Sequence, residues 1–481
     1  WNLKKSKLTP KHKIFILLPD GIGLRNFAFS NFYKIGKEKN FEIIYWNNTP
    51  FQLSELGFEE LKINKAKTHP LTDIYKNVRK KIDLHLNVQK HNDTVYHSYR
   101  FPDSYKTIKG SVRNCVINTI TAFYSTETGL KKIRGYIKDN ERKTPYYKES
   151  KKTLKQHIPA MVFCTNQRPA QGIAPILAAQ DLGIPTATFI FSWDNLPKAT
   201  MILETDYYFV WSDSMKNELQ IYYPYIDEKQ IFVTGSPQFE NHFNNSSLLS
   251  KEEFFNQYGL DLNLRYICYS GDDSTTCPDD PYYLEDLVLA VQQLNQKGFQ
   301  LGIIFRRCPV DFSNRFDWVL EKYKNVIVPL DPKWDRIGKE WNTMLPTAAD
   351  LILQTNTIAH TEMVVNVGSS MVFDYVAHNK PCAFINYDVK NKTQKNWSVK
   401  KIYNYVHFRS MPSPKAVLWL NSPDEIASKI ESAFRDSRLT VCDATAWFKL
   451  INQHPVELAS ERIWKSIQVI ISLKKTVFLT P

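Results

Sequence analysis

The chain has 481 residues, of which 43% are apolar and 13% aromatic, and its formal charge is +13. This composition excludes a disordered protein, and the length is too great for one compact core, so two domains of roughly 200 residues each are expected. The positive charge favours an anionic partner, such as nucleic acid, a phosphorylated donor or a membrane face, without choosing among them.

The seven cysteines show no CxxC pair and no zinc-like spacing, and several lie inside apolar runs. This usage is typical of buried, reduced thiols in a cytoplasmic protein. No run approaches the ~18 apolar residues of a membrane-spanning helix, and no signal peptide is visible. We therefore expect a cytoplasmic protein, either soluble or peripheral at the inner face of the cytoplasmic membrane.

The first half of the chain alternates short apolar runs with longer amphipathic stretches, as βαβ units do. Strands are predicted at 13–19, 41–46, 160–164, 186–191, 207–211 and 231–234, and helices at 175–180 and 214–222. The region from about 60 to 155, rich in Lys, Tyr and Asn, is predicted to be largely helical.

The second half repeats this alternation. Strands are predicted at 265–271, 301–305, 326–329, 363–367 and 382–385, and helices at 284–296, 371–378 and 457–473. We therefore predict an α/β protein with two Rossmann-like domains facing a central cleft, where ligands bind at the carboxyl ends of the strands. The predicted division is 1–240 for the first domain, 241–264 for a connection, 265–455 for the second domain, and 456–481 for a helix that packs back on the first.

The most informative motif lies where the strand at 363–367 ends, at Gly368-Ser369-Ser370, and a helix begins. Free N–H groups and the positive end of the helix dipole make such a start an anion site, and the two hydroxyls add donors. Asp374 follows in the helix, where its carboxylate would suit a pair of ribose hydroxyls. Taken alone, the segment is better explained by a Ser-capped helix with a structural Asp.

Together with Lys380-Pro381, this segment resembles the donor site of GT-B glycosyltransferases, although Asn379 replaces the usual glycine. The resemblance implies that Gly368, Ser369 and Ser370 hold the donor phosphates and that Asp374 grips the ribose.

A second segment, Arg306-Arg307-Cys308-Pro309, is similar to the Arg-x-His-Pro motif of CDP-glycerol glycerophosphotransferases and related bacterial cell-surface polysaccharide enzymes. There the basic residues meet donor phosphates, which implies that role for Arg306 or Arg307; Cys308 stands in the place of the histidine. The alternative is an arginine that closes the strand and pairs with a carboxylate. The resemblance also places the small-residue loop at Ser270-Gly271 against the donor phosphates, although the adjoining Asp272 and Asp273 suit sugar hydroxyls better.

On the acceptor side, Asp20-Gly21 follows the first strand, and Trp193-Asp194-Asn195 follows the strand at 186–191. Asp20 and Asp194 are both candidates for a base that removes the proton of an acceptor hydroxyl. Gly21, Trp193 and Asn195 would line the acceptor site, with Trp193 as a stacking face. A turn-forming or structural role is the alternative for each of these residues.

These observations predict a glycosyltransferase that moves a sugar from a nucleotide-activated donor to a carbohydrate acceptor in bacterial surface glycan synthesis. The acceptor is lipid-linked if the basic surface serves a membrane. The resemblance implies no metal and no other cofactor, because helix dipoles and basic side chains neutralise the leaving diphosphate. A sugar-nucleotide 2-epimerase of the same fold and a non-catalytic glycan-binding protein remain alternatives. Nucleic acid is not expected, since no aromatic-basic motif is present. An essential Asp20 or Asp194 implies inversion; otherwise a retaining route stays open.

Overall fold

The computed structural model describes residues 12–100, 107–338 and 343–477, and the chain divides into two compact units. The first unit comprises Trp1–Pro237, Arg336–Leu345 and Leu458–Pro481, and the second comprises Gln238–Asp335 and Pro346–Glu457. The predicted division places residues 336–345 in the second domain and 241–264 in a connection. In the structure residues 336–345 belong to the first unit, and residues 241–264 belong to the second. Phe254 and Phe255, in the latter range, lie in a hydrophobic core.

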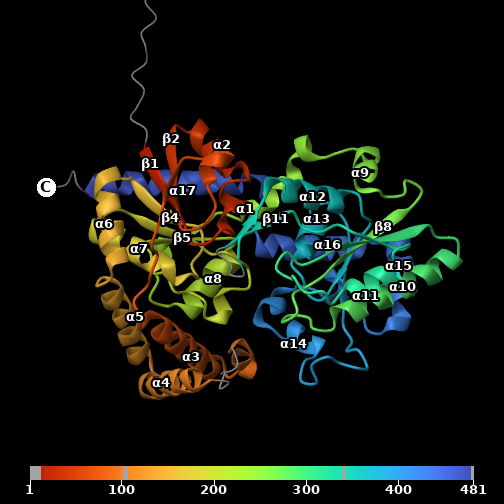
Figure 1. Ribbon diagram of the computed structural model, residues 1–481, viewed down its shortest axis with the longest axis horizontal. Helices are drawn as coiled ribbons and strands as arrows, with labels where there is room; N and C mark the ends of the chain where they lie inside the picture. Colours follow the sequence, from red (N-terminus) through yellow and green to blue (C-terminus); the bar gives the residue numbers. More distant parts are fainter. Residues whose placement is uncertain (1–11, 101–106, 339–342, 478–481) are drawn as a thin grey trace, which may run out of the picture. The chain divides into compact units, whose positions relative to one another are not determined.

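The first unit is built on a seven-stranded parallel sheet with the order β3-β2-β1-β4-β5-β6-β7 (Figure 1). Its strands are β1 (His12–Leu18), β2 (Phe41–Asn47), β3 (Glu60–Lys62), β4 (Met161–Cys164), β5 (Thr186–Phe189), β6 (Tyr207–Val210) and β7 (Ile231–Val233). All the predicted strands of this half are confirmed, and β3 is additional. The strand order reverses between β1 and β4, which makes their carboxyl ends a topological switch point.

Nine α-helices of the first unit accompany this sheet in the part of the chain that is described. They are α1 (Gly23–Phe27), α2 (Asn31–Glu38), α3 (Thr72–His91), α4 (Ile108–Tyr124), α5 (Glu127–Glu141), α6 (Pro145–His157), α7 (Ile173–Asp181), α8 (Asp213–Tyr222) and α17 (Ala459–Val477). Helices α3 to α6 lie between β3 and β4 in the chain and form a helical insertion. Ile82 of α3 and Ile133 of α5 are fully buried in the same core as Phe15 of β1, so the insertion and the sheet share one core.

The last helix, α17, completes the core of the first unit. The Trp464 ring stacks on Phe32 and Phe41, with ring centroids 4.7 and 4.6 Å apart. The indole Nε1–H also donates a hydrogen bond of 2.7 Å to the carbonyl oxygen of Phe32. The predicted helix at 457–473 is therefore present, and its aromatic residue packs within the first unit.

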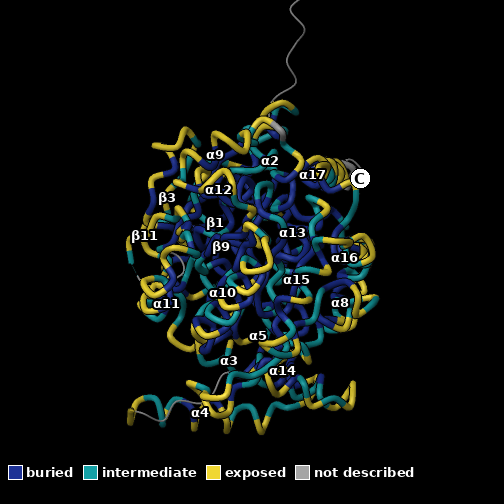
Figure 2. The backbone as a smooth tube through the Cα atoms, turned by 90° about the vertical axis from the view of Figure 1, so that its right-hand side faces the viewer, coloured by how far each residue is buried: buried dark blue, intermediate teal, exposed yellow. Residues whose placement is uncertain are grey.

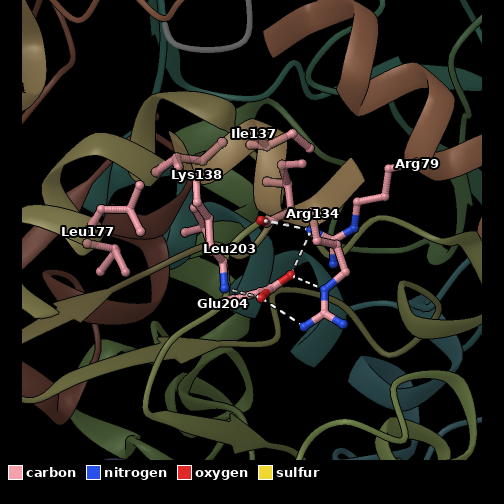
Figure 3. Close-up of a pocket in the computed structure, with 10 residues that line it drawn as sticks. Arg79, Arg134, Ile137, Lys138, Leu177, Leu203 and Glu204 are labelled. Atoms are coloured by element: carbon pink, nitrogen blue, oxygen red, sulfur yellow. Dashed lines mark hydrogen bonds and ion pairs between the residues drawn. The ribbon is translucent and has the colours of Figure 1, made fainter. Parts of the chain in front are cut away.

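A buried cluster of charges joins the helical insertion to the segment before β6 (Figure 3). The Glu204 side chain is only 8% exposed and meets three cations. Arg134 donates to its two carboxylate oxygens at 2.5 and 2.9 Å, Lys138 lies 2.5 Å away, and Arg79 lies 3.2 Å away. The cavity at this place measures about 10 Å³, which is room for about one water molecule. The cluster is therefore an internal structural contact.

The second unit is built on a six-stranded parallel sheet with the order β10-β9-β8-β13-β14-β15. Its strands are β8 (Arg265–Ser270), β9 (Leu301–Arg306), β10 (Ile327–Pro329), β13 (Val364–Asn366), β14 (Cys382–Ile385) and β15 (Leu418–Leu420). All five predicted strands are confirmed, and β15 is additional. This order also reverses once, between β8 and β13, so the second sheet has its own switch point.

The helices of the second unit are α9 (Lys251–Tyr258), α10 (Asp280–Gln296), α11 (Asp317–Lys322), α12 (Ala348–Ala359), α13 (Met371–Val376), α14 (Val399–Tyr403), α15 (Ile426–Arg435) and α16 (Arg438–Ile451). Two further strands, β11 (Trp334–Arg336) and β12 (Met344–Pro346), form a separate two-stranded sheet. Strands such as β1 and β9 lie in the buried interior of their units (Figure 2). None of the described helices is both long and apolar enough to cross a bilayer.

Candidate functional site

The loop after β13 has a backbone conformation that requires a glycine at position 368. Gly368 adopts a left-handed conformation, with φ of +67°. A Cβ at this position would lie 2.9 Å from Ile402 Cγ2 and 3.0 Å from Phe408 Cζ. Only glycine suits both the backbone angle and the space. The side chain of Asn366 then accepts a hydrogen bond of 2.8 Å from the Ser369 N–H, which fixes the loop at the second switch point.

Neither serine of this loop caps helix α13 with a short side-chain hydrogen bond. Ser370 occupies the N-cap position of α13 and makes no capping hydrogen bond with its side chain. The Ser369 hydroxyl accepts only a long contact, 3.4 Å, from the Met371 N–H. Both side chains are half-buried rather than enclosed. The Ser-capped helix considered from the sequence is therefore not what the loop forms.

Asp374, the predicted ribose contact, is a buried residue. Its Oδ1 lies 2.8 Å from Nε2 of His242. The Nδ1 of His242 in turn lies 3.2 Å from Nε2 of His378. Burial, and then the charges of His242 and Lys380, lower the pKa of His378 to about 4, so this ring is neutral at pH 7. The ribose contact of Asp374 stays a prediction, and the structure gives its carboxylate a protein partner.

Replacing His242 by Ala is expected to destabilise the second unit by about 1–3 kcal/mol, because it removes the partner of a buried carboxylate. The His378→Ala variant is the matched control, because His378 contacts His242 and not the carboxylate. Thermal unfolding would measure both. Equal melting temperatures for the two variants would contradict this account of Asp374.

Arg306, at the end of β9, forms a buried ion pair. Its Nη2 lies 2.9 Å from each carboxylate oxygen of Asp350, and the Arg306 side chain is nearly enclosed. Asp350 also accepts hydrogen bonds from the Lys333 N–H and the Trp334 indole. The strand-closing arginine with a carboxylate partner, the alternative considered from the sequence, is thus present. The Nη1 of Arg306 remains buried without a hydrogen-bond partner among the described residues. A buried donor without a partner calls for a ligand or water.

The neighbouring Arg307 contacts Ser313 and Phe316 rather than Asp350. Its Nη1 donates a hydrogen bond of 2.5 Å to the Ser313 carbonyl oxygen, and its guanidinium lies 5.4 Å from the centre of the Phe316 ring. These contacts disfavour the phosphate role predicted for Arg307. Burial raises the pKa of Cys308 to about 12, so its thiol stays protonated at neutral pH and does not replace the missing histidine.

The loop after β8 begins beside Arg306, since the Gly271 N–H donates to the Arg306 carbonyl oxygen at 3.0 Å. The predicted donor residues Ser270 and Gly271 therefore lie at the second switch point, next to β13. The Thr276 hydroxyl, however, donates to Asp273 at 2.8 Å. Burial, followed by repulsion from Asp280 and Asp273, raises the pKa of Asp272. The polar groups of this loop therefore interact largely with one another.

In the first unit, Asp20 and Asn166 meet across the other switch point. Asp20 follows β1, Asn166 follows β4, and the Asn166 amide donates to Asp20 Oδ2 at 2.8 Å. Burial raises the pKa of Asp20, while the Asn166 hydrogen bond and the charge of Arg168 offset the rise in part. Gly21 is required here, because a Cβ would lie 2.2 Å from the Met344 carbonyl oxygen. Close backbone packing is thus the observed role of Gly21.

The second base candidate, Asp194, is paired. It forms an ion pair with Lys198 and accepts a hydrogen bond of 2.9 Å from the Asn195 amide. The Oδ1 of the Asn195 side chain accepts a hydrogen bond from the Gln167 side-chain amide, also at 2.9 Å. Trp193 and Asn195 are both buried, with 7% and 4% exposure. Trp193 therefore does not present the open stacking face that the sequence suggested.

Two features of this edge were missed from the sequence. Burial, and then the charge of Asp194, raise the pKa of Glu218 on α8 to about 7. Burial, and then the charges of Arg168, Lys198 and Lys76, lower the pKa of Lys80 on α3 to about 8. Cations from α3 and from the loops after β4 and β5 therefore gather near Asp20 and Asp194. Spacing in the sequence carries no signal for either feature, since the residues come from separate elements.

Comparison with known proteins bears on the fold. No family model and no curated protein matches the sequence. Among solved structures, S. aureus MnaA in a structure with UDP is 12% identical, covers 96% of this chain and 97% of its own, and has a TM-score of 0.53. A glycosyltransferase from Rickettsia africae is 13% identical, with 96% and 99% covered and a TM-score of 0.52. A UDP-GlcNAc 2-epimerase from Methanocaldococcus jannaschii is 14% identical, with 96% and 100% covered and a TM-score of 0.51.

These similarities extend along almost the whole chain and agree with the two parallel sheets, each with a single reversal of strand order. Within the described residues, no three His, Cys, Asp or Glu side chains are grouped as metal ligands. The predicted fold class is confirmed: the chain has the α/β fold of GT-B glycosyltransferases and of the epimerases that share it.

Proposed function

We propose that this protein is an enzyme acting on a nucleotide-activated sugar, and that it transfers the sugar to a carbohydrate hydroxyl. The observation that carries the proposal is the second switch point. There the Gly368-Ser369-Ser370 loop, with two half-buried serines, lies at the end of β13. Strand β9 of the same sheet ends at Arg306, whose Nη1 is buried without a hydrogen-bond partner in the part of the chain that the structure describes. Hydroxyl and guanidinium donors at the carboxyl ends of parallel strands suit a diphosphate.

In this proposal Asp20 is the base, because it is buried, has a raised pKa and is oriented by Asn166. A carboxylate with a raised pKa is a stronger base than an ordinary aspartate. Asp194 and Glu218 are the other candidates. The cations around Lys80 favour an acceptor that itself carries negative charge. The leaving diphosphate is neutralised by the protein, so we expect turnover to persist in EDTA.

Nucleotide binding tests the donor site. Thermal shift with UDP, GDP, CDP, CMP and dTDP should identify one base that stabilises the protein. In the double variant Ser369→Ala with Ser370→Ala, affinity for that nucleotide should fall at least about tenfold, since each hydrogen bond to a charged group contributes about 1.5–3 kcal/mol. The double variant Ser428→Ala with Ser432→Ala, on α15, is the matched control. Unchanged affinity in the first variant would remove the donor site from this loop.

A 2-epimerase is the second candidate, and a specific observation favours it. Asp20, Asp194 and Glu218 place three carboxyl groups at the carboxyl edge of the first sheet, and an epimerase needs acid and base groups around one sugar. Incubation with the nucleotide sugar alone separates the two reactions. An epimerase converts the donor without an acceptor, whereas the proposed transferase requires one.

A further inference from the structure

The ion pair of Arg306 uses only one of the two terminal nitrogens of the guanidinium. An arginine that pairs with a carboxylate frequently presents two nitrogens to it in a fork. Here Nη2 alone lies 2.9 Å from both oxygens of Asp350. Nη1 is buried and has no hydrogen-bond partner in the part of the chain that the structure describes. The pair therefore fixes the guanidinium and leaves Nη1 without a role in it.

The Asp350 carboxylate is itself fixed at both oxygens. Oδ1 accepts a hydrogen bond of 2.9 Å from the Lys333 N–H, and Oδ2 accepts one of 2.8 Å from the Trp334 indole. The backbone N–H of Asp350 donates to the hydroxyl of Thr347, the N-cap of α12. Each carboxylate oxygen therefore accepts two hydrogen bonds from the protein, which is about the full capacity of the group. Asp350 is held in one orientation and has no acceptor left for a ligand.

The strand ends around Arg306 are level with one another. Ser270, the last residue of β8, is the register partner of Arg306, the last residue of β9. Strand β13 pairs with the other side of β8 and ends at Asn366, which fixes the Ser369 N–H. Neighbouring strands lie about 4.8 Å apart, so about 10 Å separate β9 from β13. Arg306 and the loop after β13 thus belong to one edge of the sheet.

Arg306 also lies on the face of the sheet that α13 covers. Burial raises the pKa of the Cys268 thiol on β8 to about 11, while a hydrogen bond with Tyr375 and the positive charge of Arg306 lower it in part. Tyr375 belongs to α13, the helix that follows the serine loop. Both groups therefore approach Cys268 from the same face.

Helix α12 connects Arg306 to the serine loop. Asp350 and Gln354 are four residues apart on this helix, so their side chains lie on one face of it. The Gln354 Nε2 lies 3.5 Å from Sδ of Met371, the first residue of α13, which directly follows Ser370. Helices α12 and α13 are accordingly neighbours in the second unit (Figure 1). One turn of α12 thus carries both the partner of Arg306 and a contact to the end of the serine loop.

We propose that Asp350 is a positioning residue of the donor site: it holds Arg306 so that Nη1 binds a phosphate oxygen of the nucleotide-activated donor. The inference rests on the proposed function, because it requires a phosphate-bearing donor at this edge. A guanidinium only donates hydrogen bonds, so its ligand must be an acceptor, and an anionic acceptor makes the stronger bond. Since the carboxylate has one orientation, the cation is in place before the donor binds. It meets the charge that develops on the leaving phosphate without rearrangement.

Nucleotide affinity in a double-mutant cycle tests this role. UDP, GDP, CDP, CMP and dTDP are each titrated into the full chain by isothermal titration calorimetry. In Arg306→Gln the affinity for the nucleotide that binds should fall at least about tenfold, because a hydrogen bond to a charged group is lost. Asp350→Asn should cause a similar loss, although Asp350 does not contact the ligand. The double variant should bind no more weakly than Arg306→Gln alone, since Asp350 acts only through Arg306.

Two further variants separate positioning from folding. Asp350→Asn leaves a buried guanidinium without its anion and therefore destabilises the second unit. Trp334→Phe is the milder change, because it removes the indole hydrogen bond to Oδ2 and keeps an aromatic ring. It should weaken nucleotide binding when Arg306 is present and have no effect in the Arg306→Gln background. The matched control is Glu362→Gln, which removes the partner of Arg265 at the opposite, amino-terminal end of β8 and should bind nucleotide like the unmodified protein.

The outcomes distinguish this inference from the proposed function. Unchanged affinity in Arg306→Gln or in Asp350→Asn, or additive losses in the cycle, would overturn the role of Asp350. The proposed donor site would still stand if the double variant Ser369→Ala with Ser370→Ala lost affinity. Absence of binding of all five nucleotides to the unmodified protein would overturn both.

Discussion

The Asp20→Asn variant is expected to lose about 10²–10⁴-fold in turnover, the usual contribution of a general base. Asparagine keeps the size of the side chain and its place beside Asn166, but it has no carboxylate to accept the acceptor proton. Nucleotide affinity should be unchanged, because the proposed donor loop belongs to the second unit. Release of free nucleotide from the nucleotide sugar that binds, in the presence of acceptor, measures the loss.

The variants of the other two candidate bases, Asp194 and Glu218, are the comparison for Asp20→Asn. Asp194→Asn and Glu218→Gln are expected to have smaller effects, since Asp194 is already paired with Lys198 and Glu218 lies on α8. If Glu218 were the base, turnover would rise with pH through about 7, where the raised pKa of Glu218 lies, and this limb would vanish in Glu218→Gln. Full turnover in the Asp20→Asn variant would exclude Asp20 as the base.

The Glu204→Gln variant is expected to show the largest loss of stability, about 3–5 kcal/mol, because it leaves buried cations without their anion. Arg79, Arg134 and Lys138 all converge on this carboxylate. The matched control is Glu228→Gln, whose pair with Lys216 is mostly exposed on the glutamate side. It should lose at most about 1 kcal/mol. Urea unfolding of the three proteins would measure the difference, and equal losses would contradict the role assigned to Glu204.

The same carboxylate predicts a pH dependence. Burial alone would raise the pKa of Glu204, but the Arg134 hydrogen bond and the three cationic charges outweigh it and lower this pKa to about 2. A lowered carboxyl pKa contributes stability that is fully present above the ordinary value of 4.5 and is lost as the pH falls from there toward 2. The stability difference between the unmodified protein and Glu204→Gln should therefore shrink on acidification over this range.

Most of the fold could be predicted because buried parallel strands leave a strong local signal. Runs such as Ile14 to Leu18 are almost uninterrupted apolar segments, as central strands of α/β sheets are. The short strand β3 was not predicted because its residues are partly exposed and carry no such run. Strand β15 lies within the apolar segment 416–420, but it is only three residues long and two of them are partly exposed. The assignment of 336–345 and 238–264 to units depends on long-range contacts, which composition along the chain does not reveal.

The candidate site was only partly predictable. The order of predicted strands and helices placed Asp20, Ser270 and Gly368 at the carboxyl ends of strands. The strand order in the structure shows that these ends are the switch points of the two sheets. The partners of the charged side chains could not be predicted from the sequence. Arg306 pairs with Asp350, and Asp374 with His242, across 44 and 132 residues of chain. Whether a charged side chain faces a ligand or another residue is decided by packing between distant elements, and sequence spacing is silent on it.

Trp464 has a consequence for synthesis. Phe32 and Phe41 emerge early in translation, yet their stacking partner belongs to α17, which follows the whole of the second unit in the chain. Domains generally fold in the order in which they are made. We therefore expect the first unit to leave the ribosome without this stacking partner and to be completed only after the second unit has been translated. A chaperone that covers these two rings meanwhile would protect the nascent chain from aggregation.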